Sequence, residues 1–421
     1  MSARLIDLVE QCYHAAIARV EAGQAVAAHL RHDDGALVIG EQRYDEVHGV
    51  YVIAIGKAAP EMIGAAECAL GAAFIAGIAV TKVAPEEYSG RARILLGAHP
   101  IPDERSLAAG EQVLAFAQAV PVGALALCLI SGGGSALVEV PRAGVSLPEL
   151  RRVTDGLLRA GASIQELNAV RARLSALKAG GLLAALRRAT VVNLIVSDVL
   201  GDDLGALASG PTVATASTID AENVLRRYNI RCELSAPRPV EGSPQPQTLI
   251  VANLSAAIDA AATAANAAGF TPVILARALD GEARVVGRVL ASIVSDTAHG
   301  RTSFTPPVAL IAGGETIVTV RGQGVGGRNS ECALAAALQL MGVANVAIGF
   351  LATDGDDAST GAAGAIITGA TLTPGARSAA ESTLAANDSW TFLEQAGATL
   401  RTGPTGTNVN DLMIALVGEA P

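Results

Sequence analysis

Glycines stand beside Lys, Ser, Asp or Arg where apolar runs of this sequence stop, and these junctions hold the residues that are able to do chemistry. The run 50–55 is followed by Gly56 and Lys57, and the run 124–130 by Ser131, Gly132, Gly133, Gly134 and Ser135. Glycine lets backbone N–H groups approach an anion closely, and lysine adds a compact positive charge. Both junctions are therefore predicted to bind phosphate or carboxylate, with a flexible turn as the alternative for the three glycines.

Three aspartates follow apolar runs in the same way. Asp198 and Asp202 come after the run 191–196, and Asp354 comes after the run 346–352. Mg²⁺ takes one or two carboxylates in proteins and leaves its other positions to water and phosphate. The three aspartates are therefore predicted metal ligands. Asp198 is also the candidate catalytic base, and capping of a turn is the alternative role for Asp202.

A glycine loop flanked by an arginine opens a predicted helix within the stretch 311–331. Gly326, Gly327 and Asn329 are predicted to bind an anion there, because a helix amino terminus presents free N–H groups and a favourable dipole. Arg328 is predicted to stabilise the charge on a transferring phosphoryl group. An arginine in that role is worth roughly 10³ to 10⁵ in rate.

Two further polar segments are candidates for binding the same kind of ligand. The loop 402–411 is rich in Thr and Gly, and its Thr405, Thr407 and Asn408 are predicted to contact an anion. Asn253, in the turn that opens the second half of the chain, is also a candidate.

A helix predicted over 168–181 would carry a polar face without acids. Asn168, Arg171, Ser175 and Lys178 recur there at spacings of three and four, so they are predicted to share one face. The absence of a carboxylate among them favours a wall that faces an anion over an ordinary solvated face. His99, in the segment HPIPD, is a weaker ligand candidate, with stabilisation of a turn as its alternative role.

The kind of reaction follows from weighing these parts together. Gly322, Gly324 and Gly327 match the dinucleotide fingerprint, so an NAD(P)H-dependent oxidoreductase is the alternative function. Against it, Asp354 lies farther on than the roughly 20 residues that the fingerprint expects. A Ser/His/Asp hydrolase is disfavoured because no G-x-S-x-G segment occurs. Phosphoryl transfer uses glycine loops, lysine, carboxylates and arginine together, because it depends on positioning and charge neutralisation.

Alternating strand and helix patterns predict an α/β fold that places these junctions at strand ends. Ligands of open α/β sheets bind beyond the carboxyl ends of the strands. A chain of 421 residues is too long for one core, so two domains are expected. The proline-rich segment 231–247 reads as a linker or surface loop, which predicts domains over 1–235 and 248–421. An amphipathic helix within 5–30 is expected to pack against a sheet.

Composition narrows the classes of partner. The net charge of −10 disfavours nucleic acid, whose binding depends on Lys and Arg at phosphates. The five cysteines are scattered without metal-site spacing, which fits a reducing cytoplasm. No secretory signal or membrane span is predicted, because acids interrupt the amino-terminal segment and polar residues interrupt the longest apolar passage. The oligomeric state stays open, with a homodimer as one candidate.

Eight segments in order resemble the glycerate 2-kinase family of the type with a carboxyl-terminal MOFRL domain, also known under the older label hydroxypyruvate reductase. They are GKAA, HPIPD, SGGGS, SDVLGDD with ASGPT, GGET, GQGVGGRN, TDGDD with AGA, and TGPTGTNVND. The resemblance covers nearly the whole chain. It implies transfer of a phosphoryl group from ATP, assisted by Mg²⁺, to the 2-hydroxyl of D-glycerate.

The resemblance also implies an architecture and a set of active-site residues. A larger Rossmann-like parallel-sheet domain and a smaller α/β domain that includes a MOFRL region at about 305–415 would hold the site in the cleft between them. Carried over by motif, Lys57 and Arg328 are the basic residues most needed for activity, and the SGGGS loop, Asp198 and Asp354 are active-site positions. The sequence departs from the family pattern near Lys178 and at Asp357, where glycine is usual.

Overall fold

The structure is a computed structural model that describes residues 2–213, 219–237 and 245–419. Two compact units make up the chain. Residues 22–251 form the first, which we call the central unit, and residues 1–21 with 252–421 form the second, the terminal unit. The predicted linker 231–247 lies partly outside the described residues. Where it is described before residue 238, it has no regular secondary structure.

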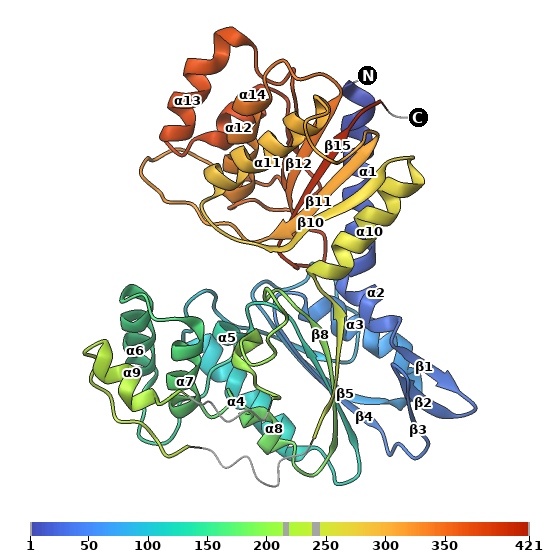
Figure 1. Ribbon diagram of the computed structural model, residues 1–421. Coiled ribbons are helices and arrows are strands. Elements are labelled where there is room, and N and C mark those ends of the chain that lie inside the picture. The colour runs from blue at the N-terminus through green and yellow to red at the C-terminus, as the bar shows by residue number, and fades with distance from the viewer. Residues whose placement is uncertain (1, 214–218, 238–244, 420–421) are drawn as a thin grey trace. The chain divides into compact units, whose positions relative to one another are not determined.

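A six-stranded sheet in the order β6-β5-β4-β7-β8-β9 is the framework of the central unit (Figure 1). Its strands are β4 (Val50–Ile55), β5 (Phe74–Thr81), β6 (Arg93–Leu96), β7 (Leu125–Ile130), β8 (Thr190–Val196) and β9 (Gln247–Ala252). Strands β4 to β8 pair in parallel. Strand β7 is buried along its whole length, as expected of a parallel strand covered on both faces. The carboxyl ends of the predicted strands therefore meet at one sheet edge.

Helices and a small antiparallel sheet surround this framework. The helices are α2 (Ala22–Ala27), α3 (Ala59–Leu70), α4 (Glu104–Ala119), α5 (Gly134–Leu137), α6 (Leu147–Arg159), α7 (Ile164–Leu174), α8 (Gly181–Ala185) and α9 (Ala221–Arg227), and the small sheet is β1 (Leu30–Asp33), β2 (Ala36–Ile39) and β3 (Gln42–Tyr44). Helices α6 and α7 each begin after a capping serine. The hydroxyl groups of Ser146 and Ser163 accept hydrogen bonds from the amides of Glu149 and Glu166.

The helix predicted over 168–181 ends early, at Leu174. The Ser175 hydroxyl oxygen accepts from the amides of Leu177 and Lys178, and Ala179 takes a left-handed conformation with φ of 47°. A serine that bonds its own following backbone offers an alternative to the helix. The prediction that Asn168, Arg171, Ser175 and Lys178 share one helical face is therefore wrong.

The terminal unit has a mixed sheet in the order β10-β11-β15-β12-β13-β14 (Figure 1). Its strands are β10 (Thr271–Leu279), β11 (Val308–Gly314), β12 (Val346–Ala352), β13 (Gly364–Thr368), β14 (Thr399–Leu400) and β15 (Asp411–Val417). Only the β10/β11 pair of this sheet is parallel among the described residues. The continuous apolar runs of β12 and β15 are fully buried because helices cover both faces.

Six helices belong to this sheet: α1 (Ser2–Val20), α10 (Leu254–Ala267), α11 (Ala283–Ala298), α12 (Arg328–Leu340), α13 (Arg377–Ala385) and α14 (Ser389–Gln395). Helices α11 and α12 pack on the face that carries Leu310, Ile348 and Met413. On the other face α1 contacts β12 and β15, and the Tyr13 hydroxyl donates to the Ala352 carbonyl at 2.8 Å. The expected packing role of the amino-terminal helix is thus confirmed, but its partner is the terminal unit, whereas we expected residues 1–235 to form one domain.

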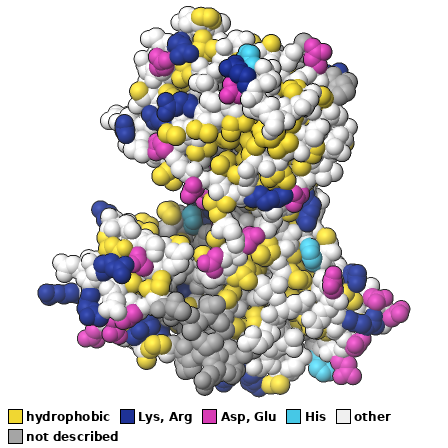
Figure 2. Space-filling view, in the orientation of Figure 1, with side chains coloured by type: hydrophobic (Ala, Val, Ile, Leu, Met, Phe, Trp, Pro, Cys, Tyr) yellow, Lys and Arg dark blue, Asp and Glu magenta, His cyan; other side chains and the backbone are white. Residues whose placement is uncertain are grey.

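The surface is mixed in charge. On the face shown in Figure 2, Lys and Arg side chains lie interspersed with Asp and Glu. Among the described residues, no helix has both the length and the apolar character that a membrane crossing needs.

Candidate active site

The sheet edge of the central unit brings Lys57 and the glycine loop together. Strands β4 and β7 are neighbours, with Ile55 opposite Ile130. Beyond their ends, the Lys57 amide donates to the Gly132 carbonyl at 2.9 Å, and the Ala58 amide donates to the Ser131 hydroxyl oxygen at 3.2 Å. Two junctions about 75 residues apart in sequence therefore form one surface, as expected for parallel strands.

Asp198 joins this surface from the end of β8. A Cβ atom at Gly132 would lie 2.0 Å from the Asp198 Oδ2 atom, so only glycine permits the carboxylate to lie against the loop. Asp202 lies farther along and has a φ of 56°, and the neighbouring Asp203 caps the turn by accepting from the Gly205 amide at 2.9 Å. Of the aspartates predicted after β8, Asp198 is the one at the loop.

The rim of the loop is a chain of hydrogen-bonded polar side chains. The hydroxyl groups of Ser135 and Ser209 are 2.8 Å apart, and Ser209 donates to the Asn168 amide oxygen at 3.0 Å. Gly133 has a φ of 85° and would place a Cβ atom 3.5 Å from His99 Nε2, so the HPIPD segment also reaches the loop. Burial, together with the charges of Lys57 and Lys82, lowers the pKa of His99. The imidazole is therefore mainly neutral at pH 7.

Arg328, at the start of α12 in the terminal unit, is held by two carboxylates. Its Nε and Nη2 atoms donate to the two oxygens of Asp411 at 2.5 and 3.2 Å, and Nη1 donates to Glu315 at 2.7 Å. Burial lowers the Arg328 pKa, but the charge and hydrogen bonds of Asp411 outweigh burial and raise it. Burial raises the Asp411 pKa to about 6 against the pull of Arg328. The guanidinium group is thus fixed in orientation.

The amino terminus of α12 already carries an anion, the Asp357 carboxylate. It accepts from the amides of Asn329 and Ser330 at 3.0 and 2.8 Å. A Cβ atom at Gly327 would lie 2.2 Å from its Oδ1 atom, so this glycine makes room for the cap. The Gly327 amide itself donates to the Ser330 hydroxyl oxygen. The amides of Gly327 and Asn329 therefore donate to an internal hydroxyl and an internal carboxylate, and anion binding by these residues stays a prediction.

The other loop glycines pack closely against the segment 386–390. A Cβ atom at Gly322 would lie 2.0 Å from the Ala386 carbonyl oxygen, and one at Gly326 would lie 2.5 Å from the Ser389 hydroxyl oxygen. The Asn387 side-chain oxygen accepts from the amides of Arg321 and Gly322. These close contacts explain the fingerprint glycines as packing requirements, and the predicted contact of Gly326 with an anion stays a prediction.

The Asp357 cap gives a testable stability effect. Asp357→Ala should lower the unfolding free energy by about 1–2 kcal/mol, because it leaves two buried amides without their acceptor. The single tryptophan, Trp390, lies in the terminal unit, so its fluorescence in urea reports the change there. The neighbouring exposed Asp356→Ala is the matched control, with an expected loss of about 0.5 kcal/mol or less. Equal losses in the two variants would contradict the capping role.

The polar loop before β15 is tied to the end of β12. The Thr405 hydroxyl donates to the Thr353 carbonyl at 2.5 Å, and the Thr353 hydroxyl oxygen accepts from the Val409 amide at 2.8 Å. Asp354 follows directly and its Oδ1 atom accepts from the Asp356 amide. The loop is therefore held beside Asp354.

The remaining candidates have mixed local roles. The Thr407 hydroxyl is buried and has no hydrogen-bond partner among the described residues, so it is the side chain of the loop that is open to a further acceptor or donor. Asn408 accepts from the Asn410 amide at 3.2 Å. Asn253 caps α10 by accepting from the Ala256 amide at 2.9 Å, which accounts for this residue without a ligand.

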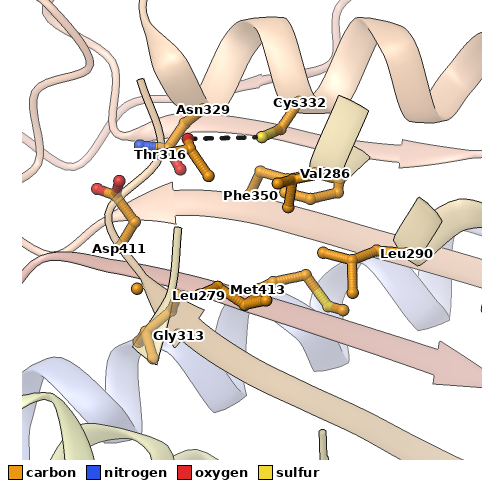
Figure 3. A pocket seen from close by; sticks show the side chains of 12 residues that line it. Leu279, Val286, Leu290, Gly313, Thr316, Asn329, Cys332, Phe350, Asp411 and Met413 are labelled. Atoms are coloured by element: carbon orange, nitrogen blue, oxygen red, sulfur yellow. Dashed lines mark hydrogen bonds between the residues drawn. The ribbon is translucent and has the colours of Figure 1, made fainter. Parts of the chain in front are cut away.

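A small cavity of about 30 Å³ lies in the terminal unit, where it is lined in part by Asp411, the partner of Arg328 (Figure 3). Asp411 and Asn329 line one end, and Leu290, Met413 and Phe350 line the other. One water needs roughly 10–15 Å³ on this measure, so the space admits about two waters and no metabolite.

The predicted metal ligands are the carboxylates of Asp198, Asp202 and Asp354. Among the described residues, no group of three His, Cys, Asp or Glu side chains is arranged to hold a metal. Mg²⁺ bound together with a nucleotide needs only one or two carboxylates, and Asp198 beside the glycine loop supplies that chemistry. Asp354 belongs to the terminal unit and Asp198 to the central unit.

Sequence reasoning missed Asp411, Glu315 and Glu139. Asp411 and Glu315 belong to the segments TGPTGTNVND and GGET. The signal that could have identified them is an acidic residue at the end of an apolar run. Glu139 follows the SGGGS loop by four residues and is wholly buried, paired with Lys178. An acid directly after an apolar stretch was the signal there.

Two family models match successive parts of this chain. Residues 8–240 match the domain of unknown function DUF4147, and residues 308–411 match the MOFRL family. A D-glycerate 2-kinase from Thermotoga maritima is 41% identical over 87% of this chain and 90% of its own. A protein of Agrobacterium vitis with the provisional name hydroxypyruvate reductase is 39% identical over 87% of each chain. A crystal structure of a glycerate kinase from Thermotoga maritima has a TM-score of 0.88, at 36% identity over 99% of this chain and 100% of that one.

Proposed function

Because the chain belongs to the glycerate kinase family, with a DUF4147 domain followed by a MOFRL domain, we propose that it transfers the γ-phosphoryl group of ATP to the 2-hydroxyl of D-glycerate. The observation that carries the proposal beyond family membership is the meeting of Lys57, the SGGGS loop and Asp198 at one sheet edge. A lysine, a glycine loop and a carboxylate are the groups that phosphoryl transfer requires.

The packing of the second glycine loop favours the kinase over a reductase. In a dinucleotide site the glycines let the backbone approach a pyrophosphate. Here Gly322 and Gly324 instead approach Ala386 and Asp388, and the Asp388 carboxylate accepts from the Val325 amide at 2.8 Å. Packing therefore explains the glycines of this loop. The segment does not show the dinucleotide site that a hydroxypyruvate reductase would need.

In the proposed reaction, the substrate hydroxyl oxygen bonds to the γ-phosphorus as the bond to the bridging oxygen breaks and ADP leaves. The hydroxyl proton would pass to the candidate base Asp198 or to water. The exposed Lys57 ammonium group and the amides of Gly132, Gly133 and Gly134 would hold phosphate oxygens. Ser131 and Ser135 would hold the loop in shape through their hydrogen bonds to Ala58 and Ser209. The loop thus provides donors fixed before the substrate binds.

Two further roles are proposed from charge. Arg328 would neutralise the negative charge of the transferring phosphoryl group with its guanidinium group. The amides of Asn329 and Ser330 behind it already donate to Asp357. Asp198, with Asp202 as a further carboxylate of the central unit, would hold Mg²⁺, which neutralises phosphate charge when it is bound with ATP. The Thr405–Asn408 loop, whose Thr407 hydroxyl is open, would contact the nucleotide or the substrate.

We also propose a reducing, cytoplasmic environment for the reaction. All five cysteines are free thiols, and Cys68 among them is exposed. Exposed thiols persist in reducing compartments, where disulfides are rare.

A coupled assay tests the function. The purified protein with D-glycerate, ATP and Mg²⁺ should form ADP and 2-phosphoglycerate, which are separated from 3-phosphoglycerate by chromatography. A parallel reaction with NADH and hydroxypyruvate should show no oxidation of NADH. Oxidation of NADH without release of ADP would overturn the proposal and restore the reductase.

Lys57→Ala should lower kcat about 10²- to 10³-fold, because it removes one fixed charge that stabilises the transferring phosphoryl group. The side chain is exposed, so the melting temperature should be unchanged. Arg188→Ala, which removes an exposed cation from the same unit, is the control and should keep kcat within about twofold. If the two variants have equal kcat, Lys57 has no catalytic role.

A further inference from the structure

A cavity of about 170 Å³ opens beside the SGGGS loop within the central unit. One water needs roughly 10–15 Å³ on the same measure, so the space is large enough for a small metabolite. Its walls come from the HPIPD segment, the residues after β7, helix α6 and helix α7. The polar side chains that line its interior are His99, Ser135, Glu139, Thr154, Arg171 and Lys178.

The buried charges of this cavity do not balance. Lys178 and Glu139 are 3% and 0% exposed and form an ion pair with each other. Arg171 adds a second cation; burial lowers its pKa and the charge of Glu139 opposes that effect. No carboxylate within the described parts of the chain lies within 4 Å of the Arg171 guanidinium. At the exposed rim, Asp155 pairs with Arg159 at 2.8 Å. In the interior the Lys178–Glu139 pair is neutral, so the charge of Arg171 remains, which a monoanion would neutralise.

The uncharged part of the lining fits a short hydroxylated chain. The Thr154 Oγ1 atom is buried and has no hydrogen-bond partner among the described residues. Ser135 offers a hydroxyl on the loop side, while Leu150 and Leu158 provide apolar contact. A buried hydroxyl without a partner costs free energy, so a ligand group that pairs with Thr154 would be favoured.

We propose that this cavity is the acceptor-substrate pocket, in which Arg171 binds the carboxylate of a small hydroxy monocarboxylic acid. For D-glycerate the inference rests on the proposed function. Gly133 and Ser135 line the cavity and belong to the loop that contacts Lys57, so the far end of a bound acid lies toward the phosphate-binding surface. Arg171 thus determines specificity: it selects an acid over a neutral polyol.

The test compares Arg171→Ala with Arg188→Ala, which removes the same charge from an exposed position in the same unit. A charge-assisted contact of this kind predicts an increase in the KM for D-glycerate of about 10- to 100-fold in Arg171→Ala. The KM for ATP should change less than twofold in both variants. Isothermal titration of D-glycerate without nucleotide provides a second readout, in which Arg171→Ala should lose the same factor in Kd and Arg188→Ala none.

A second variant tests the pocket without removing a charged side chain. Leu158 lines the cavity but is 56% exposed, so Leu158→Trp should fill the space and leave the fold intact. We expect it to raise the KM for D-glycerate at least tenfold. If the wild-type enzyme is active and both Arg171→Ala and Leu158→Trp keep this KM within twofold, the pocket assignment is overturned while the kinase stands. If Arg171→Ala does not fold, Leu158→Trp decides alone.

Failure of the proposed function would look different. Binding of D-glycerate that Arg171→Ala abolishes, in a protein that forms no phosphoglycerate, would support the pocket and overturn the kinase. Wild-type phosphorylation of glycerol and D-glycerate with equal kcat/KM would overturn the specificity role of Arg171.

Discussion

Replacing Arg328 with alanine should lower kcat about 10³- to 10⁵-fold, the range expected for an arginine that neutralises a transferring phosphoryl group. Three of its guanidinium nitrogens donate to Asp411 and Glu315, so the group is held in one orientation before the substrate binds. Fixed charge costs no reorganisation during the reaction. The effect should be read from single-turnover formation of 2-phosphoglycerate at saturating ATP and D-glycerate.

Stability must be separated from catalysis in this experiment. Arg328→Ala leaves the Asp411 carboxylate buried without its cation, whereas Arg328→Ala/Asp411→Asn removes that charge and should recover stability without recovering kcat. Arg328→Lys keeps the charge but cannot donate to both Asp411 oxygens in the same planar geometry, so it should remain well below wild type.

Arg284 offers a matched control in the same unit. Its guanidinium donates twice to the buried Glu331 carboxylate, at 3.1 Å in each bond, which resembles the pairing of Arg328 with Asp411. Arg284→Ala should therefore destabilise the unit yet keep kcat within about threefold. If kcat falls equally in Arg328→Ala and Arg284→Ala, Arg328 has only a structural role.

The strand-end junctions were predictable from the sequence because local signals specify them. A continuous apolar run that stops at glycine gave β4 its bounds, and an aspartate with a serine three residues later predicts where α4 begins. The parallel order of β4, β7 and β8 then brings Lys57 and Asp198 to the glycine loop, since parallel strands share one carboxyl edge.

Contacts between distant segments were not predictable in the same way. Asp357 caps a helix 28 residues earlier in the sequence, and Glu139 pairs with a lysine 39 residues later. A local sequence pattern shows that a carboxylate is present, but it does not show which amide or cation that carboxylate contacts. The same limit applies to α1, whose apolar face predicts packing against a sheet but does not identify the sheet.

The pairing of Lys178 with Glu139 leads to the second large effect, because the two side chains are only 3% and 0% exposed. Lys178→Met should lower the unfolding free energy of the central unit by about 3–5 kcal/mol, since it leaves the Glu139 carboxylate buried without its partner. Urea unfolding followed by far-ultraviolet circular dichroism measures the loss. Lys82→Met, at an exposed position of the same unit, should cost about 0.5 kcal/mol or less.

The double variant Lys178→Met/Glu139→Gln discriminates between a lost charge pair and lost packing. Glutamine keeps an oxygen for the Val140 amide, which donates to Glu139 at 3.1 Å, and carries no charge. If the cost of Lys178→Met arises from the unpaired carboxylate, the double variant should recover more than half of it. No recovery would mean that Lys178 stabilises the unit through its aliphatic stem instead. Replacing both members of a buried ion pair is often nearly neutral. Recovery in the double variant would therefore mean that the Lys178–Glu139 pair contributes little net stability to the fold.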